Sequence, residues 1–69
     1  MKLKIVKDFE LNGEKFHLST VNIGDKYETL LTKWVFNDPF GKECRCVEYG
    51  SFAEAIVGHN KMLRALGVA

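Results

Sequence analysis

The sequence predicts a small α+β domain: a four-stranded antiparallel β-meander followed by one C-terminal α-helix packed on one face of the sheet (β-β-β-β-α). Up to residue 49, apolar and polar side chains alternate with a period near two, as in half-buried strands. Turn-forming residues interrupt this alternation, and the last part of the chain repeats apolar side chains every three or four positions, as a helix does. We expect one domain over residues 1–69, because a chain of this length has a single thin core. The four predicted strands lie at residues 2–11, between the first two turns, at 27–36 and at about 43–49. The predicted turns lie at 12–13, 23–27 and 37–42. The predicted helix extends over residues 51–66.

The first hairpin is predicted by the Asn-Gly dipeptide at 12–13, which tolerates the positive φ angles of a type I′ turn. With this turn, Phe9 faces Phe16 and Asp8 faces His17 on the neighbouring strand. Odd positions of the first strand and even positions of the second then form the core face.

The second turn sets the register of the third strand. We expect a three-residue loop, which places Phe16 opposite Trp34 and keeps Leu30, Trp34 and Phe36 on the core face. A two-residue loop would invert this arrangement, because a slip of one residue exchanges the two faces of a strand. The third strand is apolar on both sides, so we place it inside the sheet.

The fourth strand has two possible registers. Either Cys44 and Cys46 lie under the helix with Val47 and Tyr49 outside, or the reverse. We favour the cysteines inside, because free cysteine is usually buried and Arg45 would otherwise enter the core.

The helix begins at a capping box, in which the Ser51 hydroxyl meets a backbone N–H and the Glu54 carboxylate reaches back to the N–H of the cap. Gly67 supplies the end of the helix. Gly58 inside the helix costs roughly 1 kcal/mol relative to alanine, and it indicates either a close approach to the sheet or a tolerated flaw. The apolar face of the helix consists of Phe52, Ala55, Ile56, His59, Met62, Leu63 and Leu66. We expect it to pack over Leu3, Ile5, Phe16, Leu18, Leu30 and Trp34.

Catalytic and metal chemistry are not expected. We interpret His59 as a core histidine whose ring is satisfied by a carbonyl or a hydroxyl such as that of Thr32. Cys44 and Cys46 are separated by one residue, closer than the usual pairs of zinc ligands, and His17 is expected on the other face of the sheet. The sequence also has no pattern typical of a nucleophilic thiol, a pair of catalytic acids or a phosphate-binding glycine loop. We therefore expect no metal, no cofactor and no enzymatic activity.

The charge balance disfavours a general affinity for nucleic acid or anionic lipid, because 10 basic and 9 acidic residues leave a net charge of +1. The start of the chain resembles no signal peptide, and no apolar run is long enough to span a bilayer. We therefore expect a cytoplasmic protein with reduced cysteines and no membrane association.

The face of the sheet away from the helix is the predicted binding surface, because a small monomer seldom leaves such an apolar face bare. Its candidate binding residues are Tyr27, Leu31, Lys33, Val35, Arg45 and Tyr49. We expect this face to bind another protein or a second copy of the chain as a homodimer. The alternative is a nucleic-acid-binding domain that uses the basic and aromatic residues of the sheet.

One sequence pattern extends over residues 21–63. It consists of Tyr-Glu-Thr at 27–29, an aromatic-rich stretch ending at Phe36, and then Tyr49, Glu-Ala at 54–55 and Gly-His at 58–59. The pattern resembles that of small uncharacterised bacteriophage and prophage proteins, in which a "YET…F" strand precedes a "Y…EA…GH" helix. The resemblance implies a phage accessory protein of a bacterial cytoplasm, and it carries over no catalytic residues.

Overall fold

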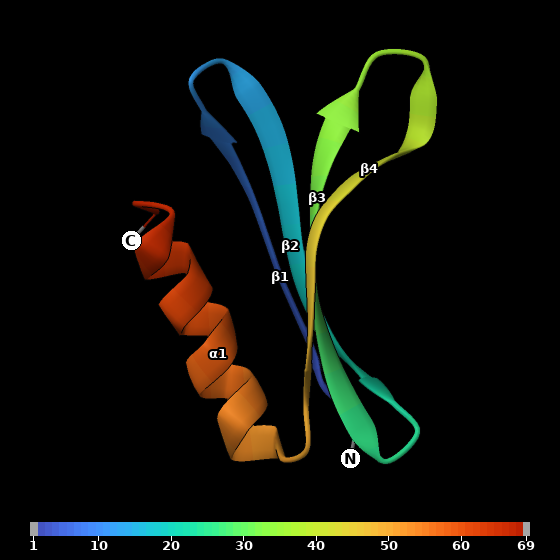
Figure 1. Cartoon of the computed structure of the whole chain (residues 1–69), viewed down its shortest axis with the longest axis vertical. Helices are drawn as coiled ribbons and strands as arrows, with labels where there is room; N and C mark the ends of the chain where they lie inside the picture. The colour runs from blue at the N-terminus through green and yellow to red at the C-terminus, as the bar shows by residue number, and fades with distance from the viewer. Residues whose placement is uncertain (1, 69) are drawn as a thin grey trace.

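The computed structural model describes residues 2–68, without the side chain of Phe40, and has the predicted α+β fold. Four antiparallel strands lie side by side in chain order: β1 (Lys4–Leu11), β2 (Glu14–Ile23), β3 (Lys26–Val35) and β4 (Asp38–Tyr49). Helix α1 (Phe52–Ala65) follows and lies along one face of this sheet (Figure 1). β3 is an inner strand as expected, so β1 and β4 form the two edges.

The two faces of the sheet differ in their burial. The face under α1, here called the covered face, contains the four buried sheet residues Leu18, Thr20, Thr29 and Leu31. The opposite face, here called the open face, contains the alternate positions of each strand, such as Val6, Ser19 and Leu30.

The first hairpin has the predicted turn and register. Asn12 and Gly13 connect β1 to β2 with φ angles of 53° and 81°. Phe9 lies opposite Phe16, and their rings stack with centroids 5.6 Å apart at the edge of the core. The pairing predicted from the Asn-Gly turn is therefore confirmed.

The predicted three-residue loop between the second and third strands is wrong. β2 runs to Ile23 and β3 starts at Lys26, so two residues connect them and Phe16 lies opposite Lys33 instead of Trp34. Gly24 has a φ angle of 62°, and glycine is the residue that a two-residue type II′ turn requires at its first position.

This shorter loop exchanges the faces of β3. Leu30 and Trp34, predicted to be core residues, lie on the open face, and Phe36 lies in the β3–β4 turn with 75% of its surface exposed. Thr29 and Leu31 take the covered positions instead and are buried.

The favoured register of the fourth strand is also wrong, and the alternative is correct. Leu30 pairs with Cys46 and Leu31 with Arg45, so Cys46 lies on the open face and Val47 on the covered face. Both cysteines are exposed and free. Arg45 lies on the covered side without entering the core, because this part of β4 borders a groove beside the helix.

β4 is also longer and less regular than predicted. It starts at Asp38, directly after a turn in which Asn37 has a φ angle of 71°. Its pairing with β3 shifts between Leu31 and Thr32 and again between Lys33 and Val35. These irregularities bend the β3–β4 hairpin away from the β1–β2 hairpin, and the two diverge at the upper end of Figure 1.

The core lies between α1 and the middle of the sheet. Its buried apolar residues are Leu18, Leu31, Ala55 and Met62. Partly buried side chains surround the cluster of Leu18, Leu31 and Met62: Phe9, Phe16, Val47, Leu63 and Leu66. Most of the predicted apolar face of the helix is therefore confirmed. Phe52 is the exception, because it is 42% exposed and contacts the Tyr27 ring edge to face at the margin of the core.

The helix begins and ends where predicted, but the Glu54 carboxylate contacts the Ser51 hydroxyl and not, as predicted, the backbone N–H of the cap. The Ser51 hydroxyl accepts from the Glu54 N–H at 3.2 Å and donates to the Glu54 carboxylate at 3.3 Å. After the C-cap Leu66, Gly67 has a φ angle of 80°, and the N–H of Val68 donates to the carbonyl of Leu63 at 2.8 Å. These bonds satisfy backbone groups that the helix termini would otherwise leave unpaired.

His59 is a core histidine, as predicted, but its partner is Thr20 and not Thr32. Its Nδ1 lies 2.8 Å from the Thr20 hydroxyl, which lies 2.5 Å from the Thr29 hydroxyl, and all three residues are buried. Burial lowers the pKa of His59 below the ordinary value of 6.5, because a charged ring would lose its hydration.

The lowered pKa makes the stability of the fold depend on pH. Above pH 6.5 His59 is neutral in both the folded and unfolded chains, so its contribution is fully present. Below 6.5 the unfolded chain takes up a proton that the folded chain does not, and stability falls by up to about 1.4 kcal/mol per pH unit. Urea midpoints measured from pH 7.5 to 5.5 should show this decline in wild type and in His17→Gln, and a weaker one in His59→Gln. An unchanged decline in His59→Gln would show that another group causes it.

Candidate functional site

The predicted binding residues lie on the covered side of the sheet, not on the open face. This correction follows from the observed registers of β3 and β4. It applies to all six predicted residues: Tyr27, Leu31, Lys33, Val35, Arg45 and Tyr49. Leu31 is 6% exposed and belongs to the core. The Lys33 ammonium forms an ion pair with Glu14 at 2.9 Å. These residues therefore do not form one exposed patch.

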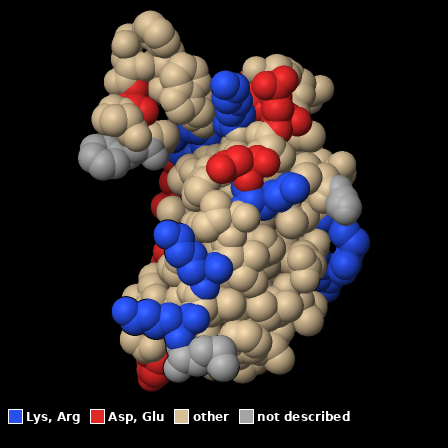
Figure 2. Space-filling model, turned by 180° about the vertical axis from the view of Figure 1, so that it is seen from behind, with Lys and Arg blue, Asp and Glu red and all other residues tan. Residues whose placement is uncertain are grey.

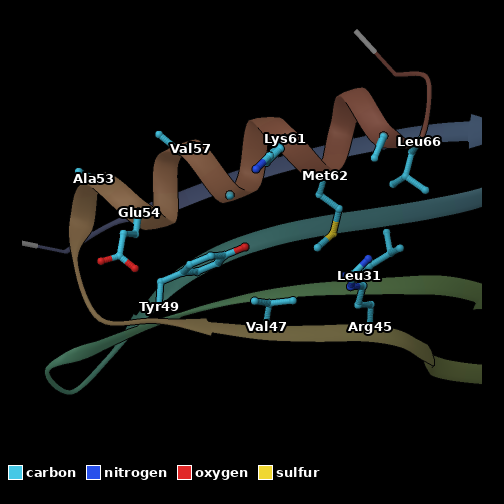
Figure 3. Close-up of a pocket in the computed structure, with 12 residues that line it drawn as sticks. Leu31, Arg45, Val47, Tyr49, Ala53, Glu54, Val57, Lys61, Met62 and Leu66 are labelled. Atoms are coloured by element: carbon cyan, nitrogen blue, oxygen red, sulfur yellow. The ribbon is translucent and has the colours of Figure 1, made fainter.

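Leu31, Arg45 and Tyr49 instead line a groove of about 740 Å³ between α1 and β4. Figure 3 shows the helix above this groove and β4 below it, with the Tyr49 ring extending beneath the helix. The groove lies on the covered side, where α1 leaves the edge of β4 accessible.

Gly58 explains how the Tyr49 ring fits beneath the helix. A Cβ atom at this position would lie 2.6 Å from Cε1 of Tyr49 and closer still to its hydroxyl. Real Cβ atoms do not approach so closely, so any larger residue would displace the ring. Of the two interpretations of Gly58, the close approach is correct.

The open side carries an exposed pair of aromatic residues that were predicted to lie on the core face. Trp34 is 60% exposed and Phe36 is 75% exposed. Their rings meet edge to face, with centroids 6.4 Å apart and an interplanar angle of 76°. The sequence signal that could have located this pair is Gly24, because glycine at the first position of a two-residue loop fixes the inverted register of β3.

A notch of about 590 Å³ lies beside Trp34, between the two diverging hairpins. Its walls include Phe9 and Phe16 from the first hairpin and Pro39 from the second. The notch thus combines an exposed tryptophan with a partly apolar recess, an arrangement in which a side chain of a partner can be buried.

Several polar groups of the open face are paired with one another. His17 Nδ1 lies 2.5 Å from the Asp8 carboxylate, as their predicted pairing requires, and the Thr32 hydroxyl donates to the His17 carbonyl at 3.3 Å. His17 shares this face with Cys46, contrary to the prediction. Even so, within residues 2–68 no three His, Cys, Asp or Glu side chains gather closely enough to hold a metal ion.

Cys46 is poorly suited to act as a nucleophile. Desolvation raises the pKa of its thiol above 9.0, and the hydrogen bond to Glu28 and the charges of Glu28, Glu43 and Glu48 raise it further. A thiol with a raised pKa remains protonated near neutral pH, whereas thiol catalysis requires the thiolate.

The charges of the open face are mixed, with more acids than lysines among its described residues. The acids are Asp8, Glu10, Glu28, Glu43 and Glu48, and the lysines are Lys4, Lys15 and Lys26. Figure 2 views the molecule from behind relative to Figure 1, toward the β1 edge of the sheet, and shows both basic and acidic side chains around a broad uncharged area on that side. The visible surface therefore carries no extended region of positive charge alone.

In comparisons with protein-family models, curated proteins and solved structures, the chain has no significant match. Across the described part of the chain, no helix has the length and apolar character needed to cross a membrane.

Proposed function

We propose that this chain is a non-enzymatic protein-binding module whose partner contacts the open side of the sheet around Trp34 and Phe36. The observation that carries this proposal is the exposure of the edge-to-face aromatic pair, 60% and 75%, in a domain with a small core. Tryptophan is among the residues most enriched at interface hot spots, because one rigid side chain buries a large area. The free chain gains little from leaving these two rings in water.

The notch beside Trp34 supports a protein partner. Hot-spot residues typically lie next to pockets that receive a side chain of the other protein, and polar residues surround them and exclude water. The notch supplies such a recess, and Lys15, His17 and Thr32 supply polar groups around it. The partner can be a different protein or a second copy of this chain.

A nucleic-acid partner fits the arrangement less well. Base stacking on Trp34 would require cations near the same rings to hold the phosphates. The basic residues Lys33, Lys42 and Arg45 lie on the covered side, and the open face carries more acids than lysines. Lys15 and Lys33 line the notch beside Trp34, but Asp8 and Glu10 line it too, and Lys33 is paired with Glu14, so a phosphate backbone would find little net attraction there.

The biological setting is a second part of the proposal. The resemblance to phage and prophage proteins supports an accessory protein made in a bacterial cytoplasm, whose target is a host protein or the chain itself. It rests on the short motifs at 27–29 and 54–59, the aromatic-rich stretch to Phe36 and Tyr49.

Affinity capture from a bacterial lysate tests the binding surface. Trp34→Ala and Phe36→Ala should each weaken retention of the partner by roughly 30-fold or more, because hot-spot truncations cost about 2 kcal/mol or more. Val57→Ala is the matched control, since Val57 is 58% exposed on the helix and away from the open face. It should leave retention unchanged.

Salt and nuclease treatments separate the two classes of partner. A protein partner should remain bound after nuclease treatment and depend weakly on salt. The proposal would be overturned if nuclease removed the captured material and its retention fell steeply with salt. In that case retention should also depend on Lys33, Lys42 and Arg45. Light scattering should show whether the partner is a second copy, through a mass that rises with concentration in wild type but not in Trp34→Ala.

A further inference from the structure

The groove between α1 and β4 carries an inference independent of the proposed function, because it lies on the opposite side of the sheet from Trp34. Its volume of about 740 Å³ falls in the usual range for sites that bind small molecules. Its walls are mainly apolar and include Val47, Val57, Met62 and Leu66. Such a site buries an aliphatic chain favourably.

The charged groups of the groove are distributed unevenly along it. Lys61 on the helix and Arg45 on β4 occupy its middle and one end (Figure 3). Neither cation has an ion-pair partner among the described residues. The acid that lines the groove is Glu54, near the start of the helix, where its carboxylate accepts a hydrogen bond from the Ser51 hydroxyl.

We propose that this groove binds a linear aliphatic carboxylate, with the carboxylate at Arg45 and Lys61 and the chain running along α1 toward Tyr49. Both cations have long, exposed side chains without an ion-pair partner among the described residues, so they can turn toward one anionic head group held between them. From Lys61 to Ala53 the helix extends about 12 Å at its rise of about 1.5 Å per residue. A zigzag of carbon–carbon bonds of about 1.5 Å fits this length with roughly ten carbons.

Methionine-methyl NMR tests this proposal directly, because Met62 lines the groove and the chain contains one other methionine. The Met62 resonance is identified with Met62→Leu, and the probes are octanoate, decanoate and dodecanoate below their micelle concentrations. We expect a saturable shift of Met62 with decanoate. From octanoate to decanoate, affinity should rise by roughly fourfold per added methylene, as each enters the groove, and then level off for dodecanoate.

Charge variants test the position of the head group. Arg45→Gln combined with Lys61→Gln should weaken decanoate binding by about tenfold, because two charge-assisted contacts are lost. Lys26→Gln, on the open face, should leave it unchanged. All of these residues are exposed, so the variants should retain the wild-type urea midpoint.

Three results would overturn the proposal. One is a Met62 resonance that decanoate does not shift. Another is equal binding of decyltrimethylammonium, which carries the opposite charge on the same tail. The third is a Met62 shift that follows protein concentration without any ligand, which would show that a second copy of the chain occupies the groove.

Discussion

Leu18→Ala is expected to lower the free energy of unfolding by about 2 to 5 kcal/mol. Leu18 is fully buried on β2, where it contacts the cluster that includes Leu31 and Met62. Removing a buried leucine side chain loses its transfer free energy and leaves a cavity that the surroundings fill only partly. Domains of this size have little stability to spare, so the variant should be substantially unfolded at room temperature. Urea denaturation followed by circular dichroism measures the effect.

Trp34→Ala is the matched comparison for Leu18→Ala. Trp34 is a larger side chain, but it is 60% exposed and lies outside the core. Its removal should change the free energy of unfolding by less than about 1 kcal/mol. If Trp34→Ala proved as destabilising as Leu18→Ala, the register between β2 and β3 would have to be the one first predicted.

Gly58→Ala is expected to destabilise the fold by up to about 2 kcal/mol, although alanine is the better helix former. The new Cβ would collide with the Tyr49 ring, and overpacking of this kind costs about 1 to 3 kcal/mol. The gain in helix propensity offsets roughly 1 kcal/mol of that cost. Urea midpoints of the variant and wild type give the net change.

A Tyr49→Ala background separates these two effects. Without the ring, Gly58→Ala should stabilise the chain by up to about 1 kcal/mol, because only the helix-propensity gain remains. The sign of the Gly58→Ala effect should therefore reverse between the two backgrounds. The same sign in both would show that the Tyr49 ring moves aside from Gly58 at little cost or does not occupy that space.

The first hairpin and the helix could be predicted from the sequence because each is determined by local chemistry. Asn12 and Gly13 select one turn type, and that turn fixes the pairing of Phe9 with Phe16. Ser51 and Gly67 mark the two ends of the helix through hydrogen bonds between near neighbours. Such signals act over a few residues and need no knowledge of the tertiary structure.

The registers of β3 and β4 could not be predicted in the same way, because both faces of β3 are apolar. By the hydrophobic pattern, Leu30 and Trp34 are as suited to the buried face as Leu31 is. A one-residue change in loop length therefore decides which face of β3 is buried. Packing against α1 favours the observed register. The small side chains Thr20 and Thr29 leave space for the buried His59. The Thr20 hydroxyl hydrogen-bonds to the His59 ring, and the Thr29 hydroxyl hydrogen-bonds to that of Thr20.

The location of the candidate site differs from the prediction because the registers of β3 and β4 differ. The preference for buried cysteines assumed that the whole covered face is core, yet α1 leaves the side of β4 accessible and Arg45 remains exposed there. The irregular pairing of β3 with β4 also has no signature in the hydrophobic pattern. Trp34 and Phe36, which were assigned to the core, are consequently exposed.

Tryptophan fluorescence of the free protein tests the central claim, that the open side presents Trp34, most directly. Trp34 is the single tryptophan of the chain, so the emission reports on this position alone. We predict that its emission maximum in the folded protein lies close to that in urea, and that acrylamide quenches both states with similar efficiency. A blue-shifted emission that acrylamide quenches only after unfolding would place Trp34 in the core and contradict the account.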